Sequence, residues 1–118
     1  GVSSAASDVY KRQNVIYAEN DDMAKGAVAA LDKANISHGV GKDVIVMGFD
    51  CNKWALEELL NQNWNYDGQC NPYQASYIED VIKKLESGEK IDEKTIIMDE
   101  KGFDATTITQ DDVDQFGI

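Results

Sequence analysis

The feature that most constrains the fold is an alternation of short apolar runs with segments of helical periodicity. The runs NVIYA (14–18) and DVIVMGF (43–49), and the weaker NYDGQC (65–70), are each followed by such a segment. This alternation is typical of βαβ units, in which crossover helices join parallel strands. DVIVMGF is apolar almost throughout, as expected of a strand that is buried on both faces. The sequence therefore predicts an α/β fold with a three-layer parallel sheet and helices on both faces.

The helical segments carry signals for their ends. Asn20 or Asp21 is expected to cap the first helix, since both residue types accept hydrogen bonds from the N–H groups of a first turn. A second helix is predicted around 52–62, and a third over 74–88 that stops at Gly88. The apolar positions that recur at helical spacing are, in turn, Met23, Ala27, Leu31 and Ala34; Leu56, Leu59 and Leu60; and Ile78, Val81, Ile82 and Leu85.

The C-terminal segment is predicted to return to the sheet. TIIMD (95–99) has the composition of a short strand, and FDATTIT (103–109) that of an extended return segment. Thr109, with Asp112 three residues later, resembles a capping box. This pair predicts a short terminal helix over 111–118.

The first 13 residues, GVSSAASDVYKRQ, differ in character from the rest. They are rich in Ser and Ala, show neither helical nor strand periodicity, and end at an abrupt change of composition. We interpret residues 1–13 as a non-native or disordered leader that resembles translated cloning sequence, and an ordinary flexible N-terminus is the alternative. We expect residues 14–118 to form part of one domain whose native chain extends upstream.

The acidic composition excludes several classes of partner. With 22 acidic and 11 basic residues, the formal net charge of −11 repels phosphate backbones and anionic lipid surfaces. No run approaches the about 20 apolar residues of a membrane span, and the N-terminus lacks the apolar core of a signal peptide. Cys51 and Cys70 lack the CxxC spacing of a zinc site. We therefore expect no nucleic-acid partner, no metal and no cofactor.

The loops that leave the three predicted strands contain polar residues and two cysteines. These are Glu19, Asn20 and Asp21 after the first strand, Asp50 and Cys51 after the second, and Cys70 and Asn71 after the third. In an open parallel sheet the carboxyl ends of the strands share one edge, and ligands bind in the crevice there. An Asn offers donors and an acceptor, and an ionised Asp accepts from two hydroxyls. This combination suits an uncharged, polyhydroxylated ligand, and an aromatic ring nearby can cover the apolar face of a sugar.

Five segments, taken in order, resemble one known family. They are YAENDDMAKGAVAAL (17–31), DVIVMGFD (43–50), GQCNPYQAS (68–76), KLESGEKI (84–91) and FDATTIT (103–109). Together they resemble the C-terminal part of the type I periplasmic sugar-binding proteins, which are the substrate-binding components of carbohydrate ABC transporters. The CNP sequence after the third strand favours the galactofuranose-binding-like branch of the ribose-type group. Each segment is weakly specific alone, but five in the right order are jointly specific.

The resemblance implies a function and roles for individual residues. It implies two α/β lobes that close over a monosaccharide, a membrane permease as partner, a periplasmic or lipoprotein location, and no enzymatic activity. It implies that Asn20 and Asp50 hydrogen-bond the hydroxyls of the sugar. Cys70 falls where ribose-type members often carry a Gln, and is included as a ligand-binding candidate. Cys51 stands where the family often has Gly, which leaves the local backbone turn open.

Each candidate also has a structural role as an alternative. Asn20 and Asp50 are both of residue types that commonly cap helices, and the spacing alone does not separate capping from ligand contact. Cys51 and Cys70 form a disulfide only if their Cα atoms lie within about 7 Å. For these two residues we expect buried thiols rather than a disulfide.

Other functions and the assembly state are also open to test. The same fold serves as the effector domain of sugar-responsive transcription regulators, which owe their DNA contact to a separate basic domain. A magnesium-dependent phosphotransfer domain would need a Lys at a later strand end, and neither CNP nor TIIMD supplies one. A sheet cut within its fold exposes a strand edge and apolar helix faces, so we expect this chain to self-associate as a dimer.

Overall fold

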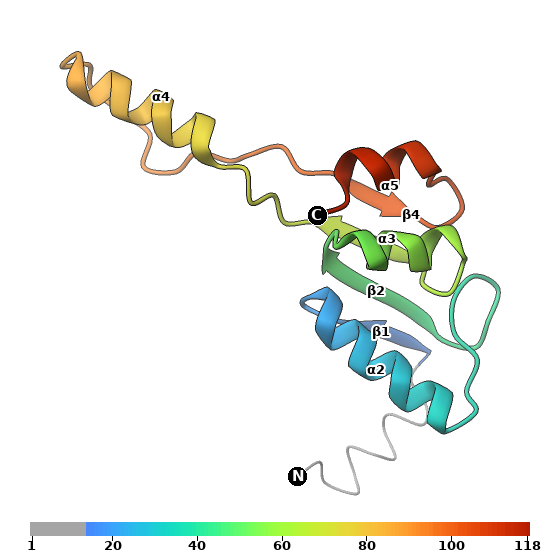
Figure 1. Ribbon diagram of the computed structural model, residues 1–118. Coiled ribbons are helices and arrows are strands. Elements are labelled where there is room, and N and C mark those ends of the chain that lie inside the picture. Colours follow the sequence, from blue (N-terminus) through green and yellow to red (C-terminus); the bar gives the residue numbers. More distant parts are fainter. Residues whose placement is uncertain (1–13) are drawn as a thin grey trace, which may run out of the picture.

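The sheet is the framework on which the candidate site is built. In a computed structural model that describes residues 14–118, four strands pair in the order β1-β2-β3-β4 (Figure 1). The strands are β1 (Val15–Tyr17), β2 (Ile45–Asp50), β3 (Tyr66–Gln69) and β4 (Gly102–Asp104). β1, β2 and β3 are parallel, whereas β4 is antiparallel to β3. The α/β class is confirmed, and the predicted leader, residues 1–13, lies outside the described residues.

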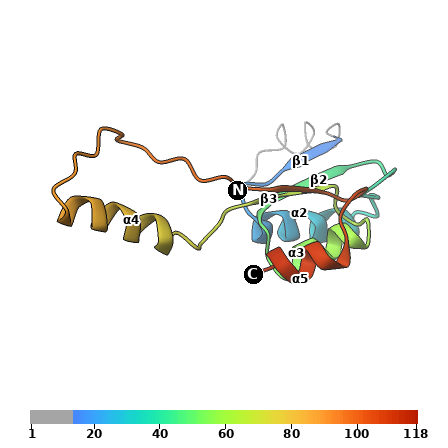
Figure 2. The same ribbon diagram turned by 90° about the horizontal axis from the view of Figure 1, so that it is seen from above.

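The helices that pack on the sheet lie on one of its faces. α2 (Asp21–Lys33), α3 (Lys53–Leu60) and α5 (Gln110–Phe116) all lie on the same side of the strands (Figure 2). We call these helices and the sheet, residues 14–69 and 102–118, the sheet domain. Its largest fully buried apolar side chains are Leu31, Val46, Leu56, Leu59, Trp64 and Val113. The core of the described chain is therefore a layer between this face of the sheet and three helices.

The opposite face of the sheet is apolar and exposed. Side chains alternate between the two faces along a strand, so Val46 is buried beneath the helices while its neighbour Ile45 points away from them. Val15, Tyr17 and Ile45 expose 43%, 64% and 41% of their surface. The sequence predicts helices on both faces, and those formed by residues 14–118 cover one of them.

The buried stripe of α2 differs from the stripe that the sequence suggests. Ala24 and Leu31 are buried and Val28 packs against the core, whereas Met23 is 55% exposed. The helix sequence DDMAKGAVAALDK contains four alanines, and the C-cap Ala34 is a fifth. These small residues make the apolar stripe broad, so the sequence does not define which side of the helix faces the sheet. Packing against β1 and β2 selects which part of that stripe is buried.

Residues 70–101 form an arm that extends away from the sheet domain (Figure 1). The arm contains α4 (Ala75–Glu86), none of whose residues is buried. α4 ends at Glu86 with Ser87 as its C-cap, and Gly88 follows with a left-handed φ of +77°, as the sequence predicts. The predicted strand at 95–99 does not form, because no strand of the described chain lies beside it to complete a ladder. Among residues 14–118, no helix has both the length and the apolar content needed to cross a bilayer.

The predicted C-terminal helix is confirmed together with its cap. Thr109 is the N-cap of α5, and its hydroxyl accepts a hydrogen bond from the N–H of Asp112. The Asp112 carboxylate in turn accepts from the N–H of Thr109 at 2.9 Å, which completes the capping box. Only the start of the predicted return segment is a strand, and it brings Phe103 into the core.

Candidate functional site

The three candidate ligand residues lie at the same edge of the sheet. Asn20 precedes α2 just after β1, and Asp50 is the last residue of β2. Asp50 pairs with Gln69, the last residue of β3, in the parallel ladder. Cys70 is the next residue after this strand end. The prediction that the strand ends share one rim is thus confirmed for these positions, and Cys70 is exposed there.

Asn20 is the N-cap of α2. Its backbone is extended, with φ of −153°, and its Oδ1 accepts a hydrogen bond of 2.8 Å from the N–H of Met23. The capping role is therefore confirmed. The cap uses the side-chain oxygen alone, so the side-chain NH₂ still carries two donors that can face a ligand.

The carboxyl group of Asp50 lies against the first turn of α2, next to Asn20. Burial raises the pKa of Asp50, and the nearby carboxylates of Asp21 and Asp22 raise it further, while a hydrogen bond from the backbone of Asp21 opposes this shift. That backbone contact joins the end of β2 to the start of α2. The structure therefore places Asp50 beside the first turn of α2, which Asn20 caps.

The turn after β2 has an unusual backbone. Asp50 has a φ of +124° and Cys51 a φ of +60°, in the region where glycine is favoured. Cys51 thus adopts the left-handed conformation although it carries a side chain. The backbone turn that the sequence analysis left open is therefore the one that glycine favours. Burial, and then the carboxylates of Asp67, Asp21 and Asp50, raise the pKa of the Cys51 thiol well above its usual range, so it stays protonated.

The two cysteines are free and differ in exposure. Cys51 is fully buried, with its Sγ 3.8 Å from Oδ1 of Asp67. Cys70 is exposed, so the expectation of two buried thiols is wrong for this residue. Cys70 directly follows the last residue of β3, Gln69, and is the first residue of the arm.

Two buried aspartates support the rim, and sequence reasoning did not predict their role. Asp21 and Asp67 are both completely buried. Asp21 Oδ2 accepts from the N–H of Asn52 at 2.9 Å and from its side-chain Nδ2 at 3.0 Å. Asp67 Oδ1 accepts from the N–H of Cys51 at 3.3 Å. The single signal in the sequence is the Asp at the centre of β3, where an apolar residue is expected.

The pKa of Asp67 lies well above its ordinary range. Burial is the main cause that raises its pKa to about 9, and its contact with the carboxyl group of Asp21 adds to this effect. The hydrogen bonds from Cys51 act in the opposite direction. Protonated Asp67 is therefore able to donate a hydrogen bond as well as accept one.

Aromatic side chains lie on the exposed face of the sheet near the rim. The rings of Tyr17 and Phe49 are 5.1 Å apart between centroids, and those of Phe49 and Tyr66 are 6.4 Å apart. Phe49 lies across β3 at Gly68, where an added Cβ would come within 2.5 Å of its ring. The sequence analysis considered aromatic cover in general, and strand alternation identifies these residues once the register is known.

Within residues 14–118, no group of three or more His, Cys, Asp or Glu side chains is arranged to hold a metal ion. The rim instead combines an amide, a carboxylate and aromatic rings. Amides and carboxylates are able to hydrogen-bond hydroxyls, and aromatic rings are able to cover apolar surface.

Comparisons with known proteins identify relatives over most of the chain. No family model matches the sequence. The fructose import binding protein of Bifidobacterium longum is 32% identical over 108 residues, which are 90% of this chain and 32% of that protein. The periplasmic binding protein of the arabinose ABC transporter from Shewanella sp. ANA-3, bound to α- and β-L-arabinofuranose, is similar in structure. It has a TM-score of 0.71 and 26% identity, with coverage of 85% of this chain and 34% of that chain.

A third likeness concerns the fold alone. A galactofuranose-binding protein has a TM-score of 0.75 with 21% identity and covers 92% of this chain and 38% of that chain. The chain thus spans about a third of the length of the proteins it matches. The two curated relatives, for fructose and ribose, are import binding proteins, and the Shewanella neighbour belongs to an arabinose ABC transporter, so the resemblance expected from the sequence is confirmed.

Proposed function

We propose that this chain, which is similar over most of its length to the sugar-binding components of ABC importers, forms part of a protein that captures a monosaccharide. Residues 14–118 would form part of one lobe and the segment that crosses to the other, and the sugar would bind between the lobes. Closure of the lobes would exclude water and signal the loaded state to a membrane permease. No bond is made or broken in this role, so the protein is not an enzyme.

The observation that carries this proposal is the meeting of Asn20 and Asp50 at the rim. The side-chain NH₂ of Asn20 can donate to sugar oxygens, while the Asp50 carboxylate, held against the start of α2, can accept from two hydroxyls. Both groups sit at the carboxyl ends of parallel strands, where α/β folds bind ligands. Cys70 is exposed at the same edge and is the third candidate contact.

Tyr17 and Phe49 would cover the apolar face of the sugar. Both belong to strand ends beside the rim, and their rings stand in tilted contact with an interplanar angle of 54°. Aromatic rings present flat apolar surface that packs against the C–H groups of a sugar ring. The arabinofuranose bound to a structural neighbour supports a five-membered sugar ring as the first ligand to test.

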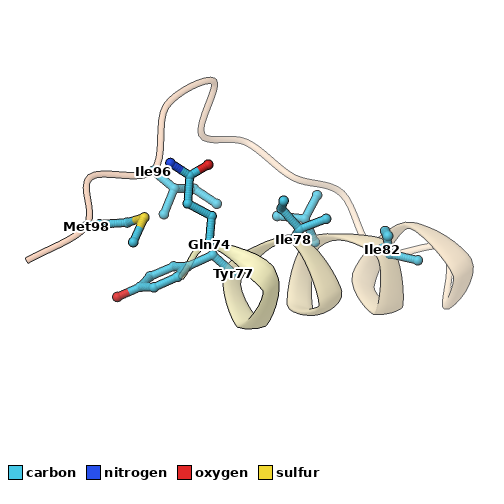
Figure 3. A pocket seen from close by; sticks show the side chains of 7 residues that line it. Gln74, Tyr77, Ile78, Ile82, Ile96 and Met98 are labelled. Atoms are coloured by element: carbon cyan, nitrogen blue, oxygen red, sulfur yellow. The ribbon is translucent and has the colours of Figure 1, made fainter. Parts of the chain in front are cut away.

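The arm supports a second lobe. A groove of about 260 Å³ is lined by Gln74, Tyr77, Ile78, Val81, Ile82, Ile96 and Met98. Figure 3 shows that the labelled side chains of α4 face the same space as Ile96 and Met98, which lie in the segment after the helix. Ile78 and Ile82 are 54% and 48% exposed on the side of α4 that lines this groove. We propose that this apolar surface packs against the other lobe, so that the arm is the crossover segment.

The relatives support a location and a partner for this protein. The import proteins support an extracytoplasmic location and an ABC permease as the membrane partner. A lipid anchor would be the simplest means of holding the protein at the membrane. The relatives favour solute capture over an effector domain of a transcription regulator, since each is described as an import or transporter component.

Calorimetric titration of a pentose and hexose panel, including furanose-forming sugars, into the complete protein tests the proposal. We expect binding by the wild type and a loss of about 10- to 100-fold in affinity for Asp50→Ala, because hydrogen bonds to a charged group are worth about 1.5–3 kcal/mol. Glu57→Ala, which removes an exposed carboxylate from α3, is the matched control and should leave affinity unchanged.

The absence of a binding signal for the wild type with every sugar of the panel would contradict sugar capture. Equal affinity of Asp50→Ala and the wild type would contradict the role of the rim residue, even if sugar binds.

A further inference from the structure

The two buried aspartates bind consecutive backbone groups of the turn that follows Asp50. Asp67 Oδ1 accepts from the N–H of Cys51, and Asp21 Oδ2 accepts from the N–H of Asn52. The Asn52 side chain adds a further bond of 3.0 Å to the same oxygen of Asp21. This turn contains the two positive φ angles, so its conformation depends on contacts that hold it.

The other oxygen of each carboxyl group faces its counterpart. Asp21 Oδ1 and Asp67 Oδ2 are buried, and no other group of the described residues donates a hydrogen bond to either. Both lie beside Gly48, where an added Cβ would be 2.6 Å from Asp21 Oδ1 and 3.5 Å from Asp67 Oδ2. The absence of a side chain at Gly48 leaves room for the two carboxyl groups to approach each other, and interaction with Asp21 is among the causes that raise the pKa of Asp67.

Among the described residues, no salt bridge links a Lys, Arg or His to these groups. The titratable groups beside them are the buried Cys51 thiol, which interacts with both, and Asp50 on β2, which interacts with Asp21. Of the lysines on α2 and α3, Lys25 lies over the ring of Trp54, Lys53 is 3.6 Å from Asp114, and Lys33 is in the last turn of α2. On the inner side the neighbour is the neutral ring of Trp64, which also lies against Gly48.

Two adjacent buried carboxylates without a cation cannot both remain ionised, because their repulsion adds to the cost of removing each from water. We infer that Asp21 and Asp67 share one proton in a carboxyl–carboxylate hydrogen bond, and that this bond holds the turn at Cys51 and Asn52 so that Asp50 is presented at the rim. Asp21 and Asp67 are thus positioning residues. The shared proton rests on the burial of both carboxyl groups, on their two unpartnered oxygens and on their common approach to Gly48, whereas its effect on sugar binding rests on the proposed function.

The shared proton makes the turn sensitive to alkaline pH. The folded-state pKa of Asp67, about 9, lies above its ordinary value of 3.8, so folding retains a proton between these values. The stabilisation from this proton is complete below the ordinary pKa and is lost as the pH rises through the folded pKa. Once the proton leaves, two negative charges face each other and the bonds that hold the turn are strained.

The test follows the backbone amide NMR signals of Cys51 and Asn52 against pH in the complete protein. In the wild type we expect one transition centred near the raised pKa of Asp67, about 9. In Asp67→Asn the transition should disappear, because the amide Nδ2 donates permanently to Asp21 while Oδ1 still accepts from Cys51. Asp80→Asn, an exposed change on α4, is the matched control and should keep the transition.

A measurement on the wild type alone needs no variant to fold. The ¹³C carboxyl shifts of labelled aspartates should show one of the two groups still protonated at pH 7. Two ionised carboxylates at that pH, or a transition that persists unchanged in Asp67→Asn, would overturn the inference.

Sugar affinity is the separate functional measurement. Above the raised pKa, wild-type affinity should fall about tenfold per pH unit, since one proton must be regained for binding, whereas Asp67→Asn should retain its neutral-pH affinity. Asp67→Ala should bind weakly at every pH, and rescue by Asn identifies the hydrogen bond as the cause. If the wild type binds no sugar, the proposed function fails, while the amide titration still tests the shared proton. If Asp67→Asn loses as much sugar affinity at alkaline pH as the wild type does, the positioning role is overturned.

Discussion

At the scale of single residues, Cys51 shows how the rim is held in a costly backbone conformation. Its φ of +60° is favourable for glycine and unfavourable for residues with a Cβ, by about 1–2 kcal/mol. The side chain is fully buried and its N–H is bound by Asp67. Packing and hydrogen bonding therefore maintain a turn that the local sequence does not favour.

Glycine at position 51 should be more favourable than alanine. We expect Cys51→Gly to be more stable than Cys51→Ala by about 1 kcal/mol, because glycine relieves the left-handed strain that alanine keeps. Both variants lose the buried Sγ, so their difference isolates the backbone. Chemical denaturation of the complete protein measures the free energies of unfolding.

A helical position provides the control for that comparison. Ala30→Gly in α2 should destabilise by about 1 kcal/mol, which is the usual sign for glycine against alanine. If Cys51→Ala were the more stable of the two variants at position 51, the strain at this turn would be disproved.

At the scale of elements, α5 depends on its capping box. Asp112 accepts hydrogen bonds from the backbone N–H and the hydroxyl of Thr109, and these bonds lower its pKa. A lowered folded pKa stabilises the protein at neutral pH, and this stabilisation is lost as the pH falls through that pKa. α5 in turn places Val113 in the core beside α3, so the cap supports the sheet domain.

We therefore expect Thr109→Ala to destabilise by about 1 kcal/mol at neutral pH. The difference from the wild type should narrow as the pH falls below 3.8, the ordinary Asp value, because protonated Asp112 no longer accepts strongly. Thr109→Ser retains the hydroxyl and should stay close to the wild type. Thermal melts over a pH series measure the stability of both variants against the wild type. A stability difference between Thr109→Ala and the wild type that does not change with pH would exclude the role of Asp112.

The contrast between α4 and the other helices is also a property of elements. α4 has a clear apolar side and a correctly placed glycine after its end, so its local sequence suffices to define it. Its packing partner is not among the described residues, since no part of α4 is buried. A helix can thus be specified locally while its place in the molecule depends on another surface.

At the scale of the whole molecule, the described chain exposes two apolar surfaces. One is the outer face of the sheet around Val15, Tyr17 and Ile45, and the other is the groove of the arm. The described chain measures 60 × 37 × 17 Å along its principal axes, which reflects the extended arm. Apolar surface of this kind favours association with another surface.

We expect these 118 residues in isolation to self-associate as a dimer. Sedimentation velocity across the micromolar range measures the association, and the paired change Ile78→Ser with Ile82→Ser should weaken it if the arm groove contributes. Lys83→Ser, on the polar side of α4, is the control. A monomer that melts cooperatively over the whole range would contradict this expectation.

The sequence by itself determined the order of the three parallel strands and of the helices, a cap at Asn20 or Asp21, the capping box at Thr109 and the common edge of the strand ends. These features depend on spacing within a few residues, together with the rule that parallel strands end at one edge. That rule placed Asn20 and Asp50 at the rim, and the family resemblance added the expectation that they bind the ligand.

The tertiary structure alone decided which stripe of α2 is buried, that helices cover one face of the described sheet, and that TIIMD stays unpaired. It also decided the contact between Asp21 and Asp67, which joins the start of α2 to the centre of β3 around Gly48. Each of these depends on residues far apart in the chain. Local spacing does not encode which distant surfaces meet, because that choice is made by packing and by the burial of paired polar groups.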